Sequence, residues 1–223
     1  MLSKVKEKLL KSLQTKKGRL KSNLCLVEGK KVIETAGKAV EFTFTNNDTD
    51  NFKDFTSTQT PQNIAGIAKI PKWNLDDIKK YKIVVVLDGI QDPGNLGSIF
   101  RLCLGFNASL ILVESVDPTN PKVIRSSVGA LFQVPWIETK RIEIEKLLED
   151  LNRPIYKLEK GESKILNSDL IEKMEKEITL IVGSEGQGIK IKTKGTSIEI
   201  KHNEKLESLN VGHALAIILN SLK

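Results

Sequence analysis

From residue 83 onward, the chain alternates between short apolar runs and segments whose apolar residues recur every three or four positions. The run IVVVLD at 83–88 is continuous and rich in β-branched residues, which is typical of a strand buried on both faces of a parallel sheet. Further strands are predicted at 109–113, 133–137, 154–157, 178–182 and 196–200, and helices at 95–105, 121–130, 142–151 and 209–221. This alternation predicts an α/β domain with a mainly parallel sheet.

The segments before residue 83 are shorter and more polar. Val5, Leu9, Leu10 and Leu13 recur at helical spacing with lysines between them, which predicts an amphipathic helix over 3–13 with its basic side outward. We predict that the following elements are a strand at 24–27, a helix at 28–39, strands at 41–45 and 64–70, and polar surface loops at 46–63. Proline, tryptophan and charged residues at 71–80 mark a boundary, so we predict a small α/β domain over 1–75 and a second domain over 80–223.

The composition is that of an ordinary globular protein, with 39% apolar and 28% charged residues. Apolar runs stay well short of the ~20 residues that cross a bilayer, and charges interrupt the apolar positions of MLSKVKEKLL, unlike in a secretory signal. We therefore expect a cytoplasmic protein without a membrane span. Cys25 and Cys103 lie in apolar runs typical of buried thiols, and with His202 and His213 they match no usual zinc-ligand spacing, so we expect no metal.

The net charge of +7 is concentrated near the N-terminus. Residues 1–40 hold eleven Lys and Arg residues against three Glu, and the remainder of the chain is close to neutral. A basic face on a neutral body is expected of a polyanion binder, because phosphate contacts supply most of the sequence-independent affinity for nucleic acid. A solvated lysine-rich surface has the same charge pattern. Charge alone leaves both interpretations open.

Two buried strands run directly into glycine-rich turns. In VLDGIQDPGNLGSIFRLCLGF at 86–106, a Gly/Pro turn opens onto a helix whose free amides favour anionic groups, and Asn95 and Arg101 follow on that helix. LIVGSEGQGI at 180–189 places Glu185 among glycines at the carboxyl end of a strand, where open α/β sheets bind ligands. Glu114, about 20 residues after the first turn, suits the ribose-binding acid of a Rossmann fold, but DPGNLGS does not match GxGxxG.

A third segment, ESLNVGHALAIILN at 207–220, places Ser208 and Asn210 just before a helix with an apolar face. Serine and asparagine are ordinary helix N-caps. An exposed glutamate in a glycine-rich loop and an arginine on a helix surface are equally ordinary. Taken one at a time, the three segments therefore also have purely structural interpretations.

Taken together, NLGSIFR, IVGSEGQGI and ESLNV resemble in order and spacing the motifs of the SpoU (TrmH-like) RNA ribose methyltransferases of the SPOUT superfamily. The resemblance covers about residues 80–223, and LCLVEGKKVIETA more loosely resembles the small RNA-binding domain found ahead of it in many members. It implies a mostly parallel sheet with a C-terminal trefoil knot, although knots are rare among folds. It also implies a homodimer that uses S-adenosylmethionine to methylate a ribose 2′-hydroxyl in RNA, with ribosomal RNA favoured over transfer RNA.

The resemblance also assigns roles to residues at matching positions. It implies a cofactor pocket formed by Gly183, Glu185, Gly186, Ile200 and Leu209. It implies a catalytic group of Asn95, Arg101, Glu185, Ser208 and Asn210. A guanidinium is a poor base because its pKa exceeds ~12, so we expect Arg101 to bind the phosphate next to the target ribose and to stabilise the developing alkoxide. We expect RNA contacts from Lys16, Lys17, Arg19 and Arg125.

Two segments depart from the family pattern, and both concern the shape of the cofactor loop. KHNEK at 201–205 replaces a Pro-Met-x-Gly stretch, and Gly212-His213 replaces a small or apolar pair after ESLNV. Two other classes of protein are possible on the sequence. A Rossmann-type oxidoreductase would bind NAD(P) instead of S-adenosylmethionine, and a non-catalytic RNA-binding protein would lack the motif residues, all of which this chain contains.

Overall fold

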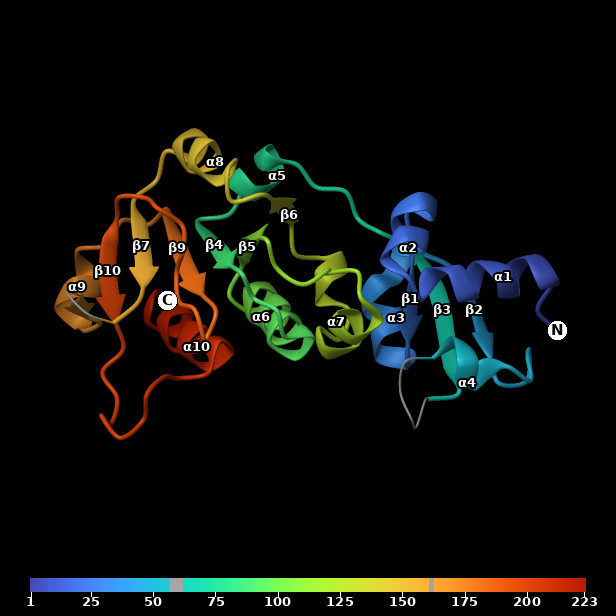
Figure 1. Ribbon diagram of the computed structural model, residues 1–223. Helices are drawn as coiled ribbons and strands as arrows, with labels where there is room; N and C mark the ends of the chain where they lie inside the picture. The colour runs from blue at the N-terminus through green and yellow to red at the C-terminus, as the bar shows by residue number, and fades with distance from the viewer. Residues whose placement is uncertain (57–61, 161–162) are drawn as a thin grey trace.

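The computed structural model describes residues 1–56, 62–160 and 163–223. Within these ranges, the strands form two separate sheets that lie in different halves of an elongated molecule (Figure 1). The larger sheet has the strand order β6-β5-β4-β9-β7-β10-β8. Each neighbouring pair of strands in it is parallel. The predicted α/β fold with a mainly parallel sheet is therefore confirmed.

The larger half alternates strands and helices along the chain. Its strands are β4 (Ile83–Asp88), β5 (Ala108–Val113), β6 (Trp136–Thr139), β7 (Ile155–Leu158), β8 (Lys164–Ile165), β9 (Ile178–Gly183) and β10 (Thr196–Glu199). Its helices are α5 (Leu75–Lys79), α6 (Pro93–Gly105), α7 (Pro121–Ser126), α8 (Ile144–Leu151), α9 (Ser168–Glu172) and α10 (Val211–Ser221).

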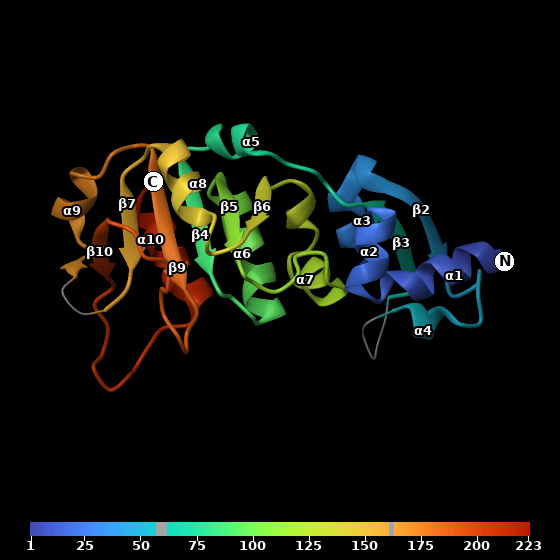
Figure 2. The ribbon, with the colours of Figure 1, turned by 45° about the horizontal axis from the view of Figure 1, so that its top comes forward.

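Helices cover both faces of the larger sheet (Figures 1 and 2). Val85 and Leu87 of β4 belong to the core beneath α6 and α10, whereas Val84 and Val86 belong to the core beneath α5 and α8. Successive residues of a strand point to opposite faces. A continuous apolar run such as 83–88 is therefore what a sheet covered on both sides requires.

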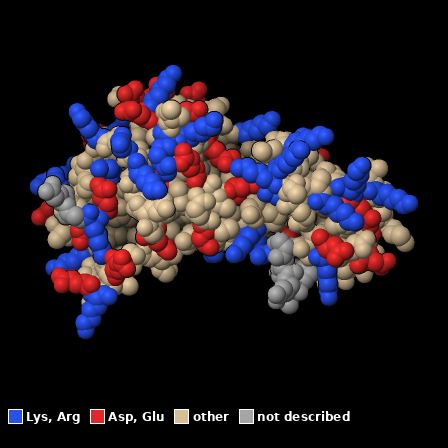
Figure 3. Space-filling model, in the orientation of Figure 1, with Lys and Arg blue, Asp and Glu red and all other residues tan. Residues whose placement is uncertain are grey.

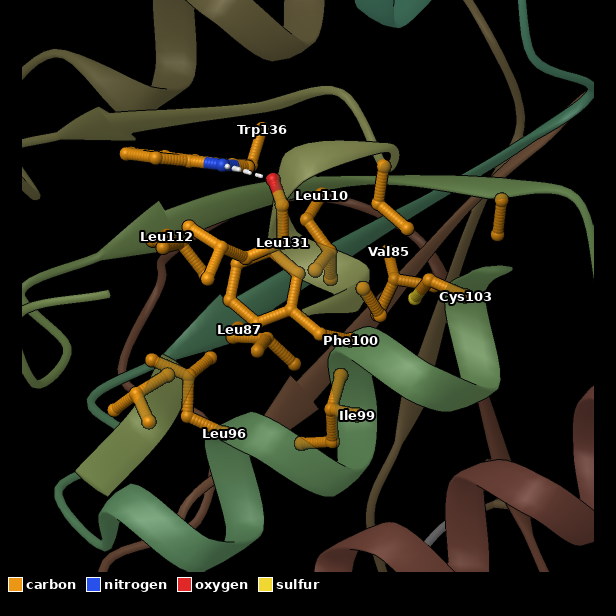
Figure 4. Close-up of a cluster of buried hydrophobic side chains, with 14 of the residues drawn as sticks. Val85, Leu87, Leu96, Ile99, Phe100, Cys103, Leu110, Leu112, Leu131 and Trp136 are labelled. Atoms are coloured by element: carbon orange, nitrogen blue, oxygen red, sulfur yellow. Dashed lines mark hydrogen bonds between the residues drawn. The ribbon is translucent and has the colours of Figure 1, made fainter. Parts of the chain in front are cut away.

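The core under α6 shows how these elements interlock (Figure 4). Leu96, Ile99 and Phe100 of α6 are fully buried against the strand side chains. The ring of Phe100 meets the indole of Trp136 edge to face, with 6.3 Å between ring centroids. The indole Nε1 of Trp136 donates a hydrogen bond to the carbonyl oxygen of Leu131 at 3.1 Å, which satisfies the polar end of a large buried ring.

The smaller half is an antiparallel sheet with helices packed on it, and its strand order among the described residues is β1-β3-β2. Leu10 and Leu13 of the first helix pack into a core with Phe44 and Phe55. The helix predicted over 3–13 is thus confirmed, with its lysines on the outer side. The elements of this half are α1 (Lys4–Leu13), α2 (Lys16–Ser22), β1 (Leu24–Glu28), α3 (Lys30–Ala36), β2 (Val40–Thr45), α4 (Phe52–Phe55) and β3 (Ile64–Lys69).

The two halves are joined by a packed interface beside α7 (Figure 1). One hydrophobic cluster includes Val27 and Val32 from the smaller half and Ile124 and Leu131 from the larger half. The side-chain amide of Gln133 also donates a hydrogen bond to a backbone carbonyl of α3 at 3.0 Å. The predicted division at 71–80 falls between the two sheets, and the assignment of 1–75 and 80–223 as separate domains stays a prediction.

Several predicted bounds are wrong for local reasons. The helix predicted over 121–130 ends at Ser126 because Val128 and Gly129 have positive φ angles of 52° and 82°. The strand predicted over 133–137 accordingly begins only at Trp136. The helix predicted over 28–39 ends at Ala36, because Gly37 has a φ of 51° and a short 3-10 turn follows.

The prediction also misses short elements, namely α2, α4, α5, β8 and α9. Helix α4 lies inside the segment 46–63 that was predicted as loops, and positions 57–61 of that segment lie outside the described residues. No helix among the described residues is long and apolar enough to span a bilayer. The trefoil knot stays a prediction.

Candidate functional site

A cavity of about 420 Å³ lies at the carboxyl end of the larger sheet, and we call it the loop cavity. Its walls come from the segments that follow β7, β9 and β10 and from the residues that lead into α10. Open α/β sheets bind ligands at this edge. The volume falls in the range of about 300–1,000 Å³ that small-molecule sites occupy.

Four of the five residues predicted to hold a cofactor line the loop cavity: Gly183, Glu185, Ile200 and Leu209. Gly186 does not line it and lies exposed at the tip of the loop after β9. The loop folds back so closely that a Cβ at Gly183 would lie 2.2 Å from the carbonyl carbon of Gly188. Glycine at position 183 is therefore required by the loop itself.

Three predicted catalytic side chains meet at the mouth of the loop cavity. The amide nitrogen Nδ2 of Asn210 donates to Oε1 of Glu185 at 2.8 Å and lies 3.0 Å from Oδ1 of Asn95. Nδ2 of Asn95 and the backbone N–H of Val211 donate to the same Glu185 oxygen at 3.3 and 3.2 Å. The acid and the two amides come from the loop after β9, from α10 and from α6, so only the folded chain assembles them.

Helix ends place the two asparagines. Asp92 caps α6 by accepting the backbone N–H of Asn95 at 2.7 Å, with Pro93 in the first turn. Asn210 caps α10, because its Oδ1 accepts the backbone N–H of Gly212 at 3.0 Å. The structural and functional interpretations of Asn210 therefore both hold: its oxygen caps the helix while its amide nitrogen contacts Glu185. Ser208 lines the cavity two residues earlier.

Arg101 is not brought to this cluster within one chain. It lies on α6 beyond Asn95, its side chain is exposed, and it lines neither the loop cavity nor the cavity beside it. Leu104 of α6 and Ile217 of α10 are also exposed, at 41% and 42%, and the two helices pack against each other. The exposed surface around Arg101 thus contains apolar side chains.

The basic residues predicted to bind RNA have different surroundings. Arg19 is buried, with 3% of its surface exposed, and donates to the side chains of Asp117 at 2.6 Å and Thr119 at 3.0 Å. Its prediction as an RNA contact is wrong, because the guanidinium joins the two halves of the molecule. Lys16 lies 3.9 Å from Glu138, and Lys17 is exposed.

Arg125 forms an ion pair across the same interface, 3.6 Å from Glu28, and remains partly exposed. Figure 3 shows lysine and arginine side chains over the visible face of the molecule with acidic side chains among them. The charge pattern therefore does not by itself decide between an RNA surface and a solvated lysine-rich one.

A second cavity, which we call the edge cavity, adjoins the loop cavity and also measures about 420 Å³. Ser184, Glu185 and Gln187 line both cavities. Glu114, which a Rossmann fold would use to bind ribose, is instead paired with the guanidinium of Arg141. This pairing leaves the Rossmann interpretation without its ribose-binding acid.

Asp88, Arg141 and His202 were not predicted as functional residues, yet all three lie at this end of the sheet. Asp88 ends β4 and is 1% exposed, and it pairs with Arg141 at 2.6 Å. A carboxylate at the end of a fully apolar strand is a signal that the sequence does contain. Arg141 lies after a strand whose predicted bounds were wrong, and His202 lies in the atypical KHNEK segment, so neither had a comparable signal.

The residues of the loop cavity fit a cationic, nucleoside-containing ligand. Its floor is apolar and includes Val182, Leu209 and Ala214. Burial would raise the pKa of Glu159 in its wall, but hydrogen bonds from Ser197 and Lys157 outweigh burial and lower that pKa, and Lys157 pairs with this carboxylate at 3.0 Å. Against one lysine among the described residues, Lys160, three further carboxylates line the cavity, namely those of Glu185, Glu199 and Glu207. This excess of carboxylates is complementary to the sulfonium and ammonium groups of S-adenosylmethionine.

His202 supplies a second observation in favour of such a ligand. Its Nδ1 lies 2.7 Å from the carbonyl oxygen of Ile200, so Nδ1 carries a proton, and in the neutral imidazole Nε2 is an acceptor. Nε2 is shut off from solvent and has no hydrogen-bond partner among the described residues. A ligand amine or hydroxyl in the cavity that His202 lines is a chemically suitable donor. Within the described part of the chain, no cluster of His, Cys, Asp and Glu suits a metal ion.

The fold and site define an α/β protein that binds a small molecule at the carboxyl ends of its parallel strands. This site lies beside Asn95, Glu185 and Asn210, which we call the acid–amide cluster. Comparison with known proteins identifies its class. Residues 82–220 match the model of the SpoU rRNA Methylase family. The chain belongs to this family, and the predicted RNA methyltransferase class is confirmed.

Individual relatives agree with this assignment. The chain is 30% identical over 239 aligned positions to the 23S rRNA (guanosine(2553)-2′-O)-methyltransferase RlmP of Bacillus subtilis, covering 96% of this chain and 94% of that one. The fold matches that of an AdoMet-bound rRNA methyltransferase from Sinorhizobium meliloti, with a TM-score of 0.84 at 22% identity over 100% and 95% of the two chains. It also matches the SpoU methyltransferase AviRb from Streptomyces viridochromogenes, with a TM-score of 0.79 at 19% identity over 99% and 97%.

Proposed function

We propose that this protein transfers the methyl group of S-adenosylmethionine to a ribose 2′-hydroxyl of ribosomal RNA in the cytoplasm. The observation that carries the proposal is the convergence of Asn95, Glu185 and Asn210 at the mouth of a cavity lined by Gly183 and Leu209. The similarity to RlmP, which extends over nearly the full length of both chains, favours ribosomal over transfer RNA.

The cofactor supplies an electrophilic methyl group on its sulfonium. The protein's own residues must align the acceptor hydroxyl with that methyl and stabilise the charge that develops on the ribose oxygen. Glu185 accepts hydrogen bonds from both asparagine amides and thereby fixes their orientation. The remaining polar atoms of Asn95, with the hydroxyl of Ser208, are then free to orient the ribose.

Arg101 stabilises the alkoxide in this proposal, and it comes from a second copy of the chain. Its exposure outside both cavities supports this arrangement, because one chain alone does not bring Arg101 to the cluster, and the guanidinium of Arg141 in the edge cavity is already paired with Asp88 and Glu114. Exposed Leu104 and Ile217 on the neighbouring helices α6 and α10 offer apolar surface for a partner to cover. A homodimer in which Arg101 of the partner subunit completes each site accounts for both features.

Lys16 and Lys17 of the smaller half and Arg125 of the larger half contribute RNA affinity. Arg19 and a shared hydrophobic cluster hold the interface between the two halves together. The basic side chains of Lys16, Lys17 and Arg125 extend the RNA contact beyond the catalytic sheet. The loops that wall the cofactor cavity are also the ones in which the predicted trefoil knot lies.

Methylation of purified RNA tests the reaction and its substrate. Ribosomal RNA and transfer RNA, each from cells that lack this protein, are incubated with the enzyme and methyl-labelled S-adenosylmethionine. We expect label in ribosomal RNA only, at a 2′-O position found by mapping. Label in transfer RNA only would overturn the substrate assignment, and a calorimetric signal with NADH but not with S-adenosylmethionine would overturn the activity.

Subunit complementation tests the shared site. The variants Arg101→Ala and Asn210→Ala are each expected to be inactive alone. Mixing them at equal amounts and allowing subunits to exchange produces heterodimers with one intact site, so about a quarter of wild-type activity returns. No recovery from mixtures that form mixed dimers would show that Arg101 acts within its own chain or not at all.

A further inference from the structure

Asp88 is a buried carboxylate that the proposed mechanism does not use. It is the last residue of β4, paired in register with Val113 of β5 and Gly183 of β9, and 1% of its surface is exposed. Its Oδ1 accepts a hydrogen bond from the guanidinium of Arg141 at 2.6 Å. Its Oδ2 accepts the backbone N–H of Ile191 at 2.8 Å and that of Lys190. Both carboxylate oxygens are thus engaged by donors from other segments.

Arg141 extends the connection to a third strand end. Its guanidinium also pairs with the side chain of Glu114, and its backbone N–H donates to Oε1 of Glu114 at 3.1 Å. Glu114 follows β5, Arg141 follows β6, and Lys190 belongs to the loop after β9. One network therefore ties the carboxyl ends of β6, β5 and β4 to that loop.

The loop held by Asp88 is the wall between the two cavities. It runs from Ser184 to Lys190, and its residues Glu185, Gln187 and Ile189 line the loop cavity. An isolated bridge between Ser184 and Gly188 closes its tip. The side chain of Glu185 fixes one part of the loop to α10, and the two amides on Asp88 fix its far end. Between these attachments Gly186, Gln187 and Gly188 are exposed and Ile189 is half-buried.

We propose that Asp88, held by Arg141, is a positioning residue for S-adenosylmethionine: it fixes the far end of the loop 184–190 so that this loop keeps the shape that binds the cofactor. Asp88 does not line the loop cavity, so it acts only through the loop. The inference rests on the proposed function, since it takes S-adenosylmethionine as the occupant of the loop cavity.

Asp88→Asn is the informative substitution, because it removes the charge and replaces one carboxylate oxygen by an NH₂ group of nearly the same shape. That group is a donor, and it faces either the guanidinium of Arg141 or the two loop amides, which are all donors as well. We expect the dissociation constant for S-adenosylmethionine to rise on the order of tenfold. The number of binding sites per chain stays at its wild-type value.

Asp117→Asn is the matched control. Asp117 also pairs with a buried guanidinium, that of Arg19 at 2.6 Å, but it lies at the interface between the two halves and lines neither cavity. Titration calorimetry separates the two effects. A variant that merely destabilises the fold melts at a lower temperature, but as long as nearly all chains stay folded its dissociation constant and its number of sites keep their wild-type values. We expect that result for Asp117→Asn, and a raised dissociation constant at a temperature where the variant is fully folded for Asp88→Asn.

Amide hydrogen exchange gives a readout without the cofactor. We expect the N–H groups of Lys190 and Ile191 to exchange faster in Asp88→Asn than in the wild type, while amides of the β4 interior keep their protection. A wild-type dissociation constant together with wild-type exchange at these two amides would overturn the proposal. If Asp88→Asn does not fold, Arg141→Gln decides the question by the same two measurements. Failure of the wild type itself to bind S-adenosylmethionine would instead overturn the proposed function.

Discussion

Replacing Arg19 by methionine removes a guanidinium that joins the two halves of the molecule. Arg19 donates to the side chains of Asp117 and Thr119 and to the carbonyl oxygen of Leu13, at 2.6, 3.0 and 2.8 Å. Methionine fills most of the same volume, so the loss is chiefly that of the charge and its hydrogen bonds. The carboxylate of Asp117, whose side chain is only 12% exposed, stays behind without its cation.

The loss of stability is large because the buried carboxylate of Asp117 is left without its cation. Breaking a buried ion pair by removing one partner costs about 3–5 kcal/mol. A domain of this length loses about 2–4 °C of Tm for each kcal/mol, so we expect Tm to fall by about 6–20 °C. Burial would raise the pKa of Asp117, but hydrogen bonds from Thr119 and Arg19 outweigh burial and lower it. The pair therefore stabilises the fold above the pKa of an unfolded aspartate, ~3.9, and this stabilisation is lost as the pH falls further.

Urea denaturation followed by circular dichroism measures the loss, with Lys17→Met as the control. Lys17 is exposed two residues away, so its replacement leaves stability within about 0.5 kcal/mol. The double variant Arg19→Met with Asp117→Leu removes the abandoned carboxylate and is expected to recover more than half of the loss. A single variant that loses less than about 1 kcal/mol, or a double variant as unstable as the single one, would refute this account.

RNA affinity separates the two interpretations of Arg19. We expect folded Arg19→Met to bind RNA with the wild-type dependence on salt, because the buried guanidinium contacts no phosphate. Lys17→Met is expected to reduce the slope of log affinity against log salt concentration by about 0.7–0.9, the effect of one lost phosphate contact. The opposite pattern would restore Arg19 as an RNA contact.

Three further substitutions or reactions test the site and the core. Asn210→Ala removes both the cap of α10 and the amide on Glu185, so we expect activity to vanish while stability falls by about 1 kcal/mol, as measured by methyl incorporation and thermal melting. His202→Phe removes the unpaired acceptor Nε2, and we expect calorimetry to show weaker binding of S-adenosylmethionine, whereas His202→Gln retains an acceptor and part of the affinity. Burial raises the pKa of the Cys25 thiol to about 12, so a thiol reagent at pH 8 should label it only at the rate of unfolding. The stability that this thiol contributes is present below its ordinary pKa of 9.0 and is lost as the pH rises towards 12, which alkaline denaturation would show.

The central strands were predictable because burial on both faces leaves little choice of residue. β4 has its predicted bounds, 83–88, and β9 extends the predicted 178–182 by one residue. Both consist of apolar runs, and such runs have few alternatives in a sheet covered by helices. β8, at an exposed edge of the sheet, has only Lys164 and Ile165 and no such pattern.

The short helices were not predicted because single polar residues determine where they begin. Asn74 forms a reciprocal capping box with Asp77 at the start of α5, and Asn167 accepts the backbone N–H of Leu170 at the start of α9. Each of these helices has only five residues, too few for hydrophobic periodicity to appear. The caps were visible in the sequence, but asparagine is equally common in loops.

The acid–amide cluster could be predicted as a set of residues but not as a geometry. Asn95, Glu185 and Asn210 were marked by their motifs, and only the strand order of the sheet brings the loop after β9 next to α6 and α10. The burial of Arg19 depends in the same way on a long-range contact, since Asp117 lies 98 positions away. Basic residues at the surface and at a buried interface look alike in a sequence.

The structure of one chain does not bring Arg101 to the site. The resemblance placed Arg101 in the catalytic group with Asn95, yet α6 directs it to the exposed side. Residues six positions apart on a helix do not share a face, because each residue turns the direction by about 100° and six of them leave the side chains about 120° apart. Asn95 and Arg101 therefore cannot both point into one cavity from the same helix. Either Arg101 acts on a neighbouring copy, or the arginine of this motif belongs to RNA binding instead of catalysis, and the complementation of Arg101→Ala by Asn210→Ala distinguishes these two roles.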